Sequence, residues 1–236
     1  MQNGHSAEKV SYLETLSLGS FSWHEVQQVI ARAKTPPSMA MLATKSFIDS
    51  AAVVLSLPFV LPLFAILALV IKLDSKGAVF FKQERTGLDG KTFYIYKFRT
   101  MTEAACGDSK ASQSQQNDQR HTRVGRFLRR TSLDELPQLI NVMRGEMSII
   151  GPRPHARYHD KLFLSSVPNY AKRFRVKPGI TGWAQVNKCR GFIESHEQIA
   201  ERTRFDNEYI DNWSMAKEIA ILFKTVWVVI SAVNAH

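Results

Sequence analysis

The longest apolar stretch of the chain covers residues 51–71, where only Ser56, Pro58 and Pro62 interrupt the hydrophobic side chains. At about 1.5 Å of rise per residue, a helix over this stretch would be roughly 30 Å long, which matches the hydrocarbon thickness of a bilayer. The pattern therefore predicts a membrane helix, which we place at residues 45–72.

Two features of this stretch favour a helix that enters the membrane and returns to the same side. Pro58 and Pro62 each remove a backbone hydrogen bond near the middle, so a bend is expected there. Basic residues crowd both ends, and the positive-inside tendency would keep both flanks in the cytoplasm. These residues are Arg32, Lys34 and Lys45 before the stretch, and Lys72, Lys76, Lys82 and Arg85 after it. We predict a re-entrant membrane helix hairpin; a straight span and a buried core helix are the alternatives.

The pattern outside the membrane helix predicts an α+β fold that is largely helical. Residues 1–44 are mostly polar and mixed, which indicates a variable, partly helical tail. Residues 73–236 are expected to form a small cytoplasmic domain with short strands. Its strand signals cover residues 78–81 and 92–98, around the turn-prone run Gly87-Leu88-Asp89-Gly90, and they predict one hairpin.

Two further segments have distinctive compositions. Residues 103–119 are rich in Ser, Gln, Ala, Asp and Asn without an apolar period, so we expect a loop there, either an ordinary surface insertion or a lid. Residues 219–233 are apolar and include Lys224 and Trp227. That composition predicts an amphipathic helix in the membrane interface, with packing against the domain core as the alternative.

Basic residues exceed acidic ones by 31 to 21, and the chain carries a formal charge of +10. Such an excess indicates an anionic partner, which could be nucleic acid, acidic lipid headgroups or a phosphorylated substrate; a merely solvated basic surface is the alternative. Cys106 and Cys189 form no CxxC pair, so neither a disulfide framework nor a zinc site is indicated. We expect reduced thiols that face the cytoplasm.

Candidate chemistry begins at Asp134 and Glu135, two adjacent carboxylates that follow Arg129 and Arg130. We expect a helix to begin near Asp134, because this start leaves Pro137 in the first turn, where proline is tolerated. The positive end of the helix dipole would then favour an ionised carboxylate and attract phosphate. In the alternative interpretation, both acids only cap the helix and pair with the preceding arginines.

Two later segments add candidate binding residues. The run Gly151-Pro152-Arg153-Pro154 fixes the backbone with two prolines and projects one guanidinium, which can bind phosphate oxygens in a bidentate way. In residues 177–185, turn-forming glycines precede Trp183, which could support a nucleotide or sugar or pack in the core. Three histidines lack metal-ligand spacing and are expected at the surface or in hydrogen bonds. They are His155, His159 and His196.

Several motifs, in this order along the chain, resemble those of the bacterial sugar transferases, the monotopic polyprenyl-phosphate phosphoglycosyl transferases. The resemblance rests on Lys97-Phe98-Arg99-Thr100-Met101, residues 129–138, Asn141-Val142, residues 147–154 and residues 178–186. It covers the chain from residue 45 to residue 229. The branch that transfers glucose 1-phosphate to undecaprenyl phosphate, at the start of exopolysaccharide synthesis, is the most similar one, as judged from residues 151–156, Arg190-Gly191 and residues 209–214.

This resemblance implies a transfer in two steps. Asp134 would attack the sugar-linked phosphate of a UDP-sugar, UMP would depart, and a phosphosugar-aspartyl enzyme would remain. Undecaprenyl phosphate would then take the phosphosugar. A carboxylate that approaches an anionic diphosphate needs Mg²⁺ and arginines to neutralise charge, and covalent capture lets one small site handle a soluble and a lipid substrate in turn.

The resemblance also assigns roles to individual residues. Asp134 and Glu135 are the expected catalytic pair and the expected Mg²⁺ ligands, and Pro58 and Pro62 are expected to form the membrane bend. The expected substrate phosphate-binding residues are Arg129 and Arg153, together with the motif positions Lys97, Arg99, Gln138 and Asp206.

The chain departs from the family's pattern at two places. Leu61 precedes Pro62 where the family often has serine, whose hydroxyl would satisfy a carbonyl freed at the kink. Residues 187–191 read Asn-Lys-Cys-Arg-Gly, whereas related proteins commonly place Gly and Trp before the Arg-Gly. The sugar, of glucose or galactose type, is therefore left open. We expect a minimal catalytic unit, without the extra amino-terminal membrane helices and accessory domain of larger relatives.

The expected partners are a UDP-sugar, undecaprenyl phosphate and membrane lipid; a homo-oligomer is an open option, and nucleic acid is not expected. The expected location is the bacterial inner membrane, with the catalytic domain on its cytoplasmic face, and the expected process is exopolysaccharide or capsule biosynthesis. Two other interpretations stay open. One is a membrane-tethered module that binds anionic lipid or nucleic acid with strongly salt-dependent affinity, and the other is an inactive scaffold of a polysaccharide assembly complex.

Overall fold

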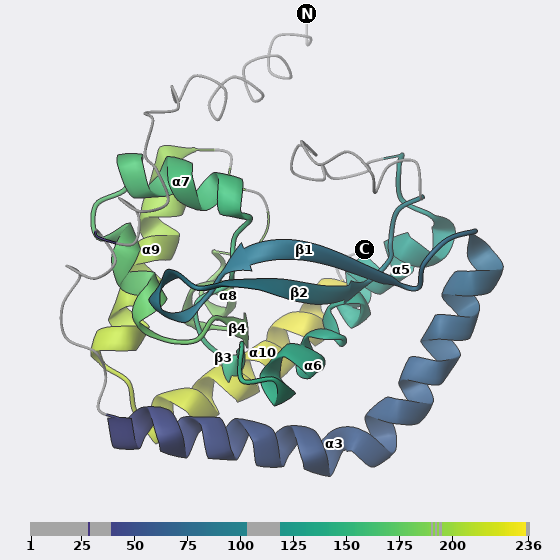
Figure 1. The fold of residues 1–236 in the computed structure, drawn as a ribbon, viewed down its shortest axis with the longest axis horizontal. Coiled ribbons are helices and arrows are strands. Elements are labelled where there is room, and N and C mark those ends of the chain that lie inside the picture. The colour runs from purple at the N-terminus through teal and green to yellow at the C-terminus, as the bar shows by residue number, and fades with distance from the viewer. Residues whose placement is uncertain are drawn as a thin grey trace, which may run out of the picture.

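The computed structural model describes residues 28, 39–102, 119–189, 191, 193 and 195–234. Its elements are mostly helices, with two small sheets of two strands each, so the prediction of a largely helical α+β fold is confirmed (Figure 1). Most of the predicted tail at residues 1–44 and of the predicted loop at residues 103–119 lies outside the described residues.

Short 3-10 turns, labelled η, separate several of the helices and strands. The elements are, in chain order, α3 (Met39–Asp74), β1 (Phe80–Thr86), η1 (Leu88–Gly90), β2 (Thr92–Phe98), α5 (Arg123–Thr131), η2 (Leu133–Glu135), α6 (Gln138–Met143), β3 (Ser148–Ile150), α7 (Arg157–Ser166), η3 (Tyr170–Arg175), β4 (Gly179–Thr181), α8 (Trp183–Val186), α9 (His196–Asp211) and α10 (Met215–Asn234).

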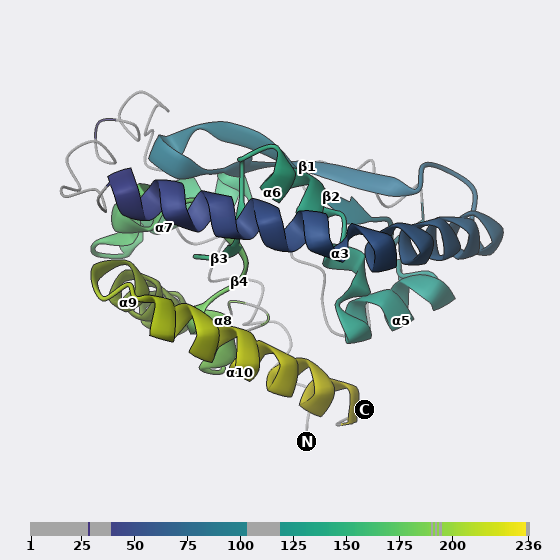
Figure 2. The ribbon, with the colours of Figure 1, turned by 90° about the horizontal axis from the view of Figure 1, so that it is seen from below.

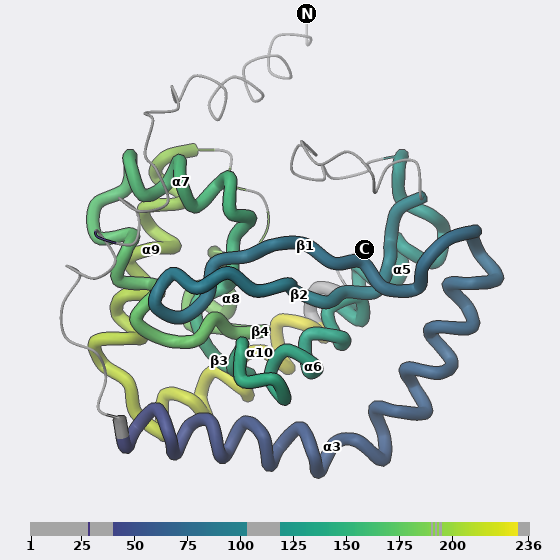
Figure 3. The backbone as a smooth tube through the Cα atoms, in the orientation of Figure 1, coloured from purple at the N-terminus to yellow at the C-terminus, as the bar shows by residue number. Residues whose placement is uncertain are grey.

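Helix α3 is a single helix of 36 residues that contains both Pro58 and Pro62. Figures 1 and 3 show that it bends near its middle, as the two missing backbone hydrogen bonds predict. Before the prolines, the hydroxyl of Ser56 donates to the carbonyl of Val53 at 2.7 Å and satisfies one backbone group there. The helix begins earlier and ends later than the predicted segment at residues 45–72, and the return of both ends to one side of a membrane stays a prediction.

Strands β1 and β2 form the predicted antiparallel hairpin, with Phe80 opposite Phe98 and Thr86 opposite Thr92. The first strand starts later than predicted and is longer, because pairing with β2 carries it through a run of charged residues whose side chains alternate between more and less exposed positions. Apolar and polar residues do not alternate in this charged run, so the sequence carries no signal of a strand there. The second strand places Lys97 close to η2.

Strands β3 and β4 pair in parallel and fix the start of the loop that carries Arg153. The backbone amide of Gly151 donates to the carbonyl of Thr181 at 2.9 Å, and the amide of Gly179 donates to the carbonyl of Pro152 at 2.9 Å. A Cβ atom on Gly179 would lie 2.0 Å from the amide nitrogen of Gly151, so only glycine fits at this close approach.

Helices α3 and α10 run across one face of the molecule, as Figure 2 shows from below. On α10, Ile221 is fully buried against the domain, whereas Phe223 and Trp227 are 74% and 73% exposed. Packing against the domain core, one of the two alternatives for residues 219–233, is therefore confirmed for part of α10, and its place in a membrane interface stays a prediction. One side of α10 packs against the domain core, and the other side is exposed and apolar.

A buried ion pair joins these two helices. The ammonium of Lys45 on α3 lies 2.5 Å from the carboxylate of Glu218 on α10. The same carboxylate accepts hydrogen bonds from the hydroxyl of Tyr209 and, at 2.9 Å, from the indole N–H of Trp213. Separation of the two charges would leave each of them buried without a partner, which costs free energy. The contact therefore holds the first half of α3 against the domain.

Candidate active site

Asp134 and Glu135 lie in the short turn η2, between α5 and α6. Ser132 caps the end of α5 in a left-handed backbone conformation, with φ of 60°, and turns the chain into η2. Our expectation that a helix begins near Asp134 is wrong, since α6 begins at Gln138 with Pro137 as its N-cap. The proline lacks a backbone N–H and here separates two helical segments instead of lying inside one.

Glu135 is held between two cations. Nη1 and Nη2 of Arg153 donate to its two carboxylate oxygens at 3.0 and 2.5 Å, and Nζ of Lys97 donates to Oε1 at 2.7 Å. Burial opposes ionisation of Glu135, but the charges of Arg153 and then Lys97 outweigh it and hold the pKa of this carboxyl well below its ordinary value. Glu135 is therefore an anion at neutral pH, and the fork of Arg153 binds this carboxylate.

Asp134 has a different environment, although it is the neighbouring residue. It is 8% exposed, and Nζ of Lys97 lies 4.0 Å from its Oδ2 atom. Burial raises the pKa of this carboxyl above its ordinary value, and the charge of Lys97 offsets only part of the rise. Two adjacent carboxyls whose surroundings move their pKa values apart can take different chemical roles.

Three other predicted phosphate-binding residues are Arg129 and Gln138, which lie near this pair in the chain, and Arg99, which directly follows β2. Nη1 of Arg129 contacts Nε2 of His121 at 2.8 Å. Arg99 is buried and donates from Nη2 to the carbonyl and hydroxyl of Ser75 at 2.7 and 3.0 Å. Among the described residues, nothing bonds to its Nε and Nη1 atoms or to the buried side-chain amide of Gln138. Because buried polar groups of this kind cost free energy until water or a ligand satisfies them, both residues are candidates for contact with substrate.

Asp206 lies outside the cluster formed by the carboxylate pair and its cations. Its carboxylate is 2% exposed and accepts a hydrogen bond from Nε of Arg173 at 2.8 Å. Arg173 in turn donates from Nη2 to the backbone carbonyl of Arg153 at 2.7 Å. The structure thus brings Lys97 and Arg153 to the carboxylate pair and places Asp206 behind the Arg153 loop.

The donors in this cluster fit a Mg²⁺ ion held jointly with a substrate. Such an ion is usually bound by one or two carboxylates plus substrate phosphates rather than by a dedicated protein cage. Asp134 and Glu135 supply hard oxygen donors, and the part of the chain that the structure describes contains no group of three or more His, Cys, Asp or Glu that could form a cage. Because Arg153 and Lys97 engage the oxygens of Glu135, Asp134 has the freer carboxylate.

Trp183 packs within the domain, which was one of its two predicted roles. Its indole N–H donates to Glu208 at 3.0 Å, and the ammonium groups of Lys217 and Lys224 lie 5.0 and 4.5 Å from its ring centroid. These contacts occupy the indole with protein groups from α9 and α10.

Sequence reasoning missed the buried polar network behind the Arg153 loop. His155 is 7% exposed, and its Nδ1 atom lies 2.6 Å from the hydroxyl of Tyr170, so this histidine is a hydrogen-bonding residue and not a surface one. Arg173 belongs to the same network. His155 belongs to the motif at residues 151–156, but no spacing along the chain predicts these contacts, because the partners come from other elements.

A buried carboxylate pair held by cations lies beside a helix that is long and apolar enough to cross a membrane, and these features suit a membrane-associated protein. By length and composition, that helix within the described residues is α3, over Ala40–Asp74. The sequence profile of a family described as Bacterial sugar transferase matches residues 40–232. The chain belongs to the bacterial sugar transferase family.

Named relatives in this family are similar along most of the chain. A UDP-glucose:undecaprenyl-phosphate glucose-1-phosphate transferase of Escherichia coli (strain K12) is 46% identical over 199 residues, which are 84% of this chain and 43% of the relative. A protein of the same name from Caulobacter vibrioides is 44% identical over 200 residues, 85% of this chain and 74% of the relative.

A third relative carries a different sugar in its name. The UDP-N-acetylgalactosamine-undecaprenyl-phosphate N-acetylgalactosaminephosphotransferase of Aeromonas hydrophila is 39% identical over 203 residues, 85% of this chain and 47% of the relative. The chain thus spans less than half the length of the Escherichia and Aeromonas relatives. Relatives named for different sugars share this level of similarity with the chain, so the similarity does not by itself identify a sugar.

Proposed function

We propose that this protein transfers a sugar 1-phosphate from a UDP-sugar to undecaprenyl phosphate, with Asp134 as the nucleophile. The observation that carries the proposal is the contrast between two adjacent carboxyls. Glu135 is engaged by Arg153 and Lys97, whereas Asp134 lies 4.0 Å from Lys97, beyond hydrogen-bond distance. Relatives named for this transfer, at 46% and 44% identity, support it.

In the first step, a carboxylate oxygen of Asp134 attacks the phosphorus that bears the sugar. The bond from this phosphorus to the bridging oxygen breaks, UMP leaves with that oxygen and the electron pair, and a phosphosugar-aspartyl enzyme forms. Lys97 holds fixed positive charge 4.0 Å from the reacting carboxylate, and Arg153 holds positive charge at the neighbouring carboxylate of Glu135. Such preorganised charge stabilises the transferring phosphoryl group without reorganisation during the reaction.

In the second step, a phosphate oxygen of undecaprenyl phosphate attacks the same phosphorus, and the carboxylate of Asp134 is released unchanged. The product is a polyprenyl diphosphate sugar. One site thereby serves a soluble anion first and a lipid-bound anion afterwards. We propose that Asp134 and Glu135 would hold Mg²⁺ together with the substrate diphosphate. A bound Mg²⁺ would supply positive charge that neutralises phosphate oxygens.

The proposed location is the cytoplasmic face of the bacterial inner membrane, with α3 as a re-entrant helix. The bend of α3, its two internal prolines and the basic residues at both ends support this arrangement. The exposed apolar side of α10 would lie in the same membrane interface, close to the phosphate of the lipid substrate. We place the reaction at the initiating step of exopolysaccharide or capsule synthesis, with glucose as the first sugar to test.

Asp134→Asn tests the nucleophile. With Mg²⁺, undecaprenyl phosphate and a panel of UDP-sugars, the detergent-solubilised wild-type protein is expected to release UMP. Without the lipid acceptor, it is expected to gain the mass of one phosphosugar. Because an amide is a much weaker nucleophile than a carboxylate, Asp134→Asn should lower both by at least about 10³-fold, as measured by UMP release and intact-mass spectrometry.

Asp211→Asn is the matched control, since Asp211 is a half-exposed aspartate that pairs with Arg175 at the end of α9. This variant should keep both UMP release and the adduct. Persistent adduct formation in Asp134→Asn would rule out the nucleophile assignment. Strongly salt-dependent binding of anionic lipid or nucleic acid without UMP release would favour the binding module instead, and a folded protein with neither property would favour the inactive scaffold.

A further inference from the structure

Arg173 lies on η3 and makes several polar contacts from one buried guanidinium. Nε donates to Asp206 at 2.8 Å, Nη1 donates to the hydroxyl of Tyr170 at 2.8 Å, and Nη2 donates to the backbone carbonyl of Arg153 at 2.7 Å. Nη1 also lies 3.1 Å from Nδ1 of His155. The side chain of Arg173 is 3% exposed, so acceptors in the protein interior hold this cation in one orientation.

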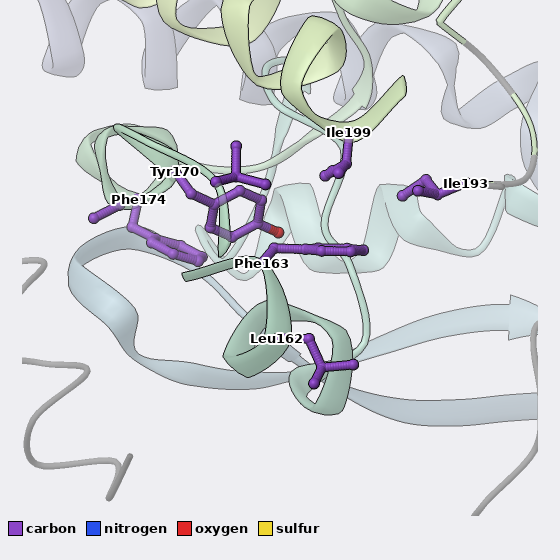
Figure 4. Close-up of a cluster of buried hydrophobic side chains, with 8 residues drawn as sticks. Leu162, Phe163, Tyr170, Phe174, Ile193 and Ile199 are labelled. Atoms are coloured by element: carbon purple, nitrogen blue, oxygen red, sulfur yellow. The ribbon is translucent and has the colours of Figure 1, made fainter. Parts of the chain in front are cut away.

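The partners of Arg173 are themselves fixed. The hydroxyl of Tyr170 donates to the buried carboxylate of Asp160 at 2.6 Å. Its ring packs against Phe163 and Phe174, at centroid distances of 5.6 and 5.9 Å, within the apolar cluster drawn in Figure 4. The guanidinium carbon of Arg173 lies 4.8 Å from the centroid of the Tyr170 ring. The network is therefore anchored in a packed core and is not a surface arrangement.

The connection to the active site runs through one backbone carbonyl. Arg153 lies between Pro152 and Pro154, whose rings leave the loop few free dihedral angles. The guanidinium of the same residue donates to both oxygens of Glu135. A shift of the Arg153 carbonyl would therefore move its guanidinium relative to the carboxylate pair.

We propose that Arg173 and Asp206 are positioning residues, which hold the backbone carbonyl of Arg153 and so aim its guanidinium at Glu135 without touching substrate. The inference rests on the proposed function and assigns Asp206 a role that it exerts through Arg173 rather than the predicted role in phosphate binding. Groups that orient the direct contacts of a site commonly change activity by about 10- to 100-fold when they are replaced. A misplacement of about 1 Å at a reacting centre has an effect of similar size.

Arg173→Lys tests the inference directly. The lysine keeps a positive charge beside Asp206 but lacks the planar fork that reaches several acceptors at once. We expect kcat/KM for UMP release to fall by about 10- to 100-fold. The matched control is Arg175→Lys on the same turn, because Arg175 also pairs with α9, through Asp211 at 3.1 Å, and should keep wild-type activity. Wild-type activity in Arg173→Lys would overturn the inference.

Double variants separate positioning from a merely structural role. If Arg173 acts through Arg153, then Arg153→Lys/Arg173→Lys should lose no more activity than Arg153→Lys alone. Asp206→Asn can still accept a hydrogen bond from Arg173, so its loss should be smaller than that of Arg173→Lys and should also vanish in the Arg153→Lys background. Losses that multiply in the double variants would show independent roles and contradict the positioning role.

A second readout needs no turnover. Modification of Arg153 by phenylglyoxal, located by peptide mass spectrometry, should be several-fold faster in Arg173→Lys than in the wild-type protein, because the guanidinium is less firmly held. Arg175→Lys should match the wild type. Equal rates in Arg173→Lys and wild type would overturn the inference, whereas a wild-type protein that never releases UMP would contradict the proposed function alone.

Discussion

At the scale of single residues, two carboxyls that are adjacent in the chain, Asp134 and Glu135, have pKa values shifted in opposite directions. Burial raises the pKa of Asp134, whereas Arg153 and Lys97 outweigh burial and hold the pKa of Glu135 low. The difference arises because β2 and the loop after β3 bring their cations into direct contact with Glu135 only. Lys97 is nevertheless within 4.0 Å of both carboxyls, so its charge lowers the pKa of both.

Lys97→Met is expected to raise the pKa of both carboxyls, because the ammonium lowers both. A smaller fraction of Asp134 is then ionised at a given acidic pH, so the acid limb of the rate of UMP release should move to higher pH. The rate at the optimum should fall by roughly 10²-fold, since a fixed charge next to the transferred phosphate is lost. Rates measured across the pH range check both effects. Lys91→Met, in the exposed turn of the hairpin, is the control, and an unmoved acid limb in Lys97→Met would contradict this role.

At the scale of elements, the bend of α3 follows from backbone chemistry. Pro58 and Pro62 each cost a helix interior about 3 kcal/mol, and both lie in one helix whose apolar surface is mostly exposed. A straight helix of this length would be long enough to cross a bilayer. The prolines are therefore expected to decide between a re-entrant helix and a span.

Pro58→Ala/Pro62→Ala is expected to straighten α3 and carry its first end across the membrane. The test uses a single cysteine at Ala40→Cys, before the bend, with the native Cys106 and Cys189 replaced by serine. A membrane-impermeant maleimide applied to the outer side of the inner membrane should label this cysteine only in the double proline variant. A cysteine at Ala78→Cys, after the helix, is the control and should stay unlabelled. Labelling at Ala40→Cys with both prolines present would show a span.

At the scale of the whole molecule, the interior behind the active site is unusually polar. Arg173 and Arg202 both approach the imidazole of His155, at 3.1 and 3.3 Å, and Asp160 lies 4.0 Å from it. Burial, followed by the charges of the two arginines and of Arg85, holds the pKa of His155 well below its ordinary value. His155 is therefore neutral in the folded protein at pH values where it would be protonated in the unfolded chain.

The folded protein should lose stability through His155 as the pH falls below the unfolded pKa of 6.5. Only the unfolded state gains this proton, so between pH 7.5 and 5.5 the contribution to the free energy of unfolding falls by about 1 kcal/mol. In His155→Gln this loss is absent. As the pH falls from 7.5 to 5.5, the free energy of unfolding of the variant should therefore rise by that amount relative to that of the wild type. Chemical denaturation in detergent at both pH values measures it. Burial raises the pKa of Asp160 to about 6, but this residue is present in both proteins, so its effect on stability is shared. A difference in free energy of unfolding between variant and wild type that does not change with pH would contradict the role of His155.

Much of the architecture was predictable because it depends on residues that are close in the chain. The two prolines in an apolar stretch predicted the bent helix, and the turn-prone run Gly87-Leu88-Asp89-Gly90 predicted the hairpin. The motif residues around Asp134 were found in the same way. The length of β1 and the start of α6 at Gln138 were not predicted, because pairing with β2 and the position of the preceding turn set them.

The sequence by itself determined which chemical groups the protein has and which local structures carry them, since propensity, proline geometry and hydrophobic period act over a few residues. Only the tertiary structure decided which cation meets which acid. Lys97, Glu135, Arg153 and Arg173 come from β2, η2, the loop after β3 and η3, and their contacts depend on distances that no period along the chain encodes. The same packing gave Asp134 and Glu135 opposite pKa shifts and placed Asp206 behind the site.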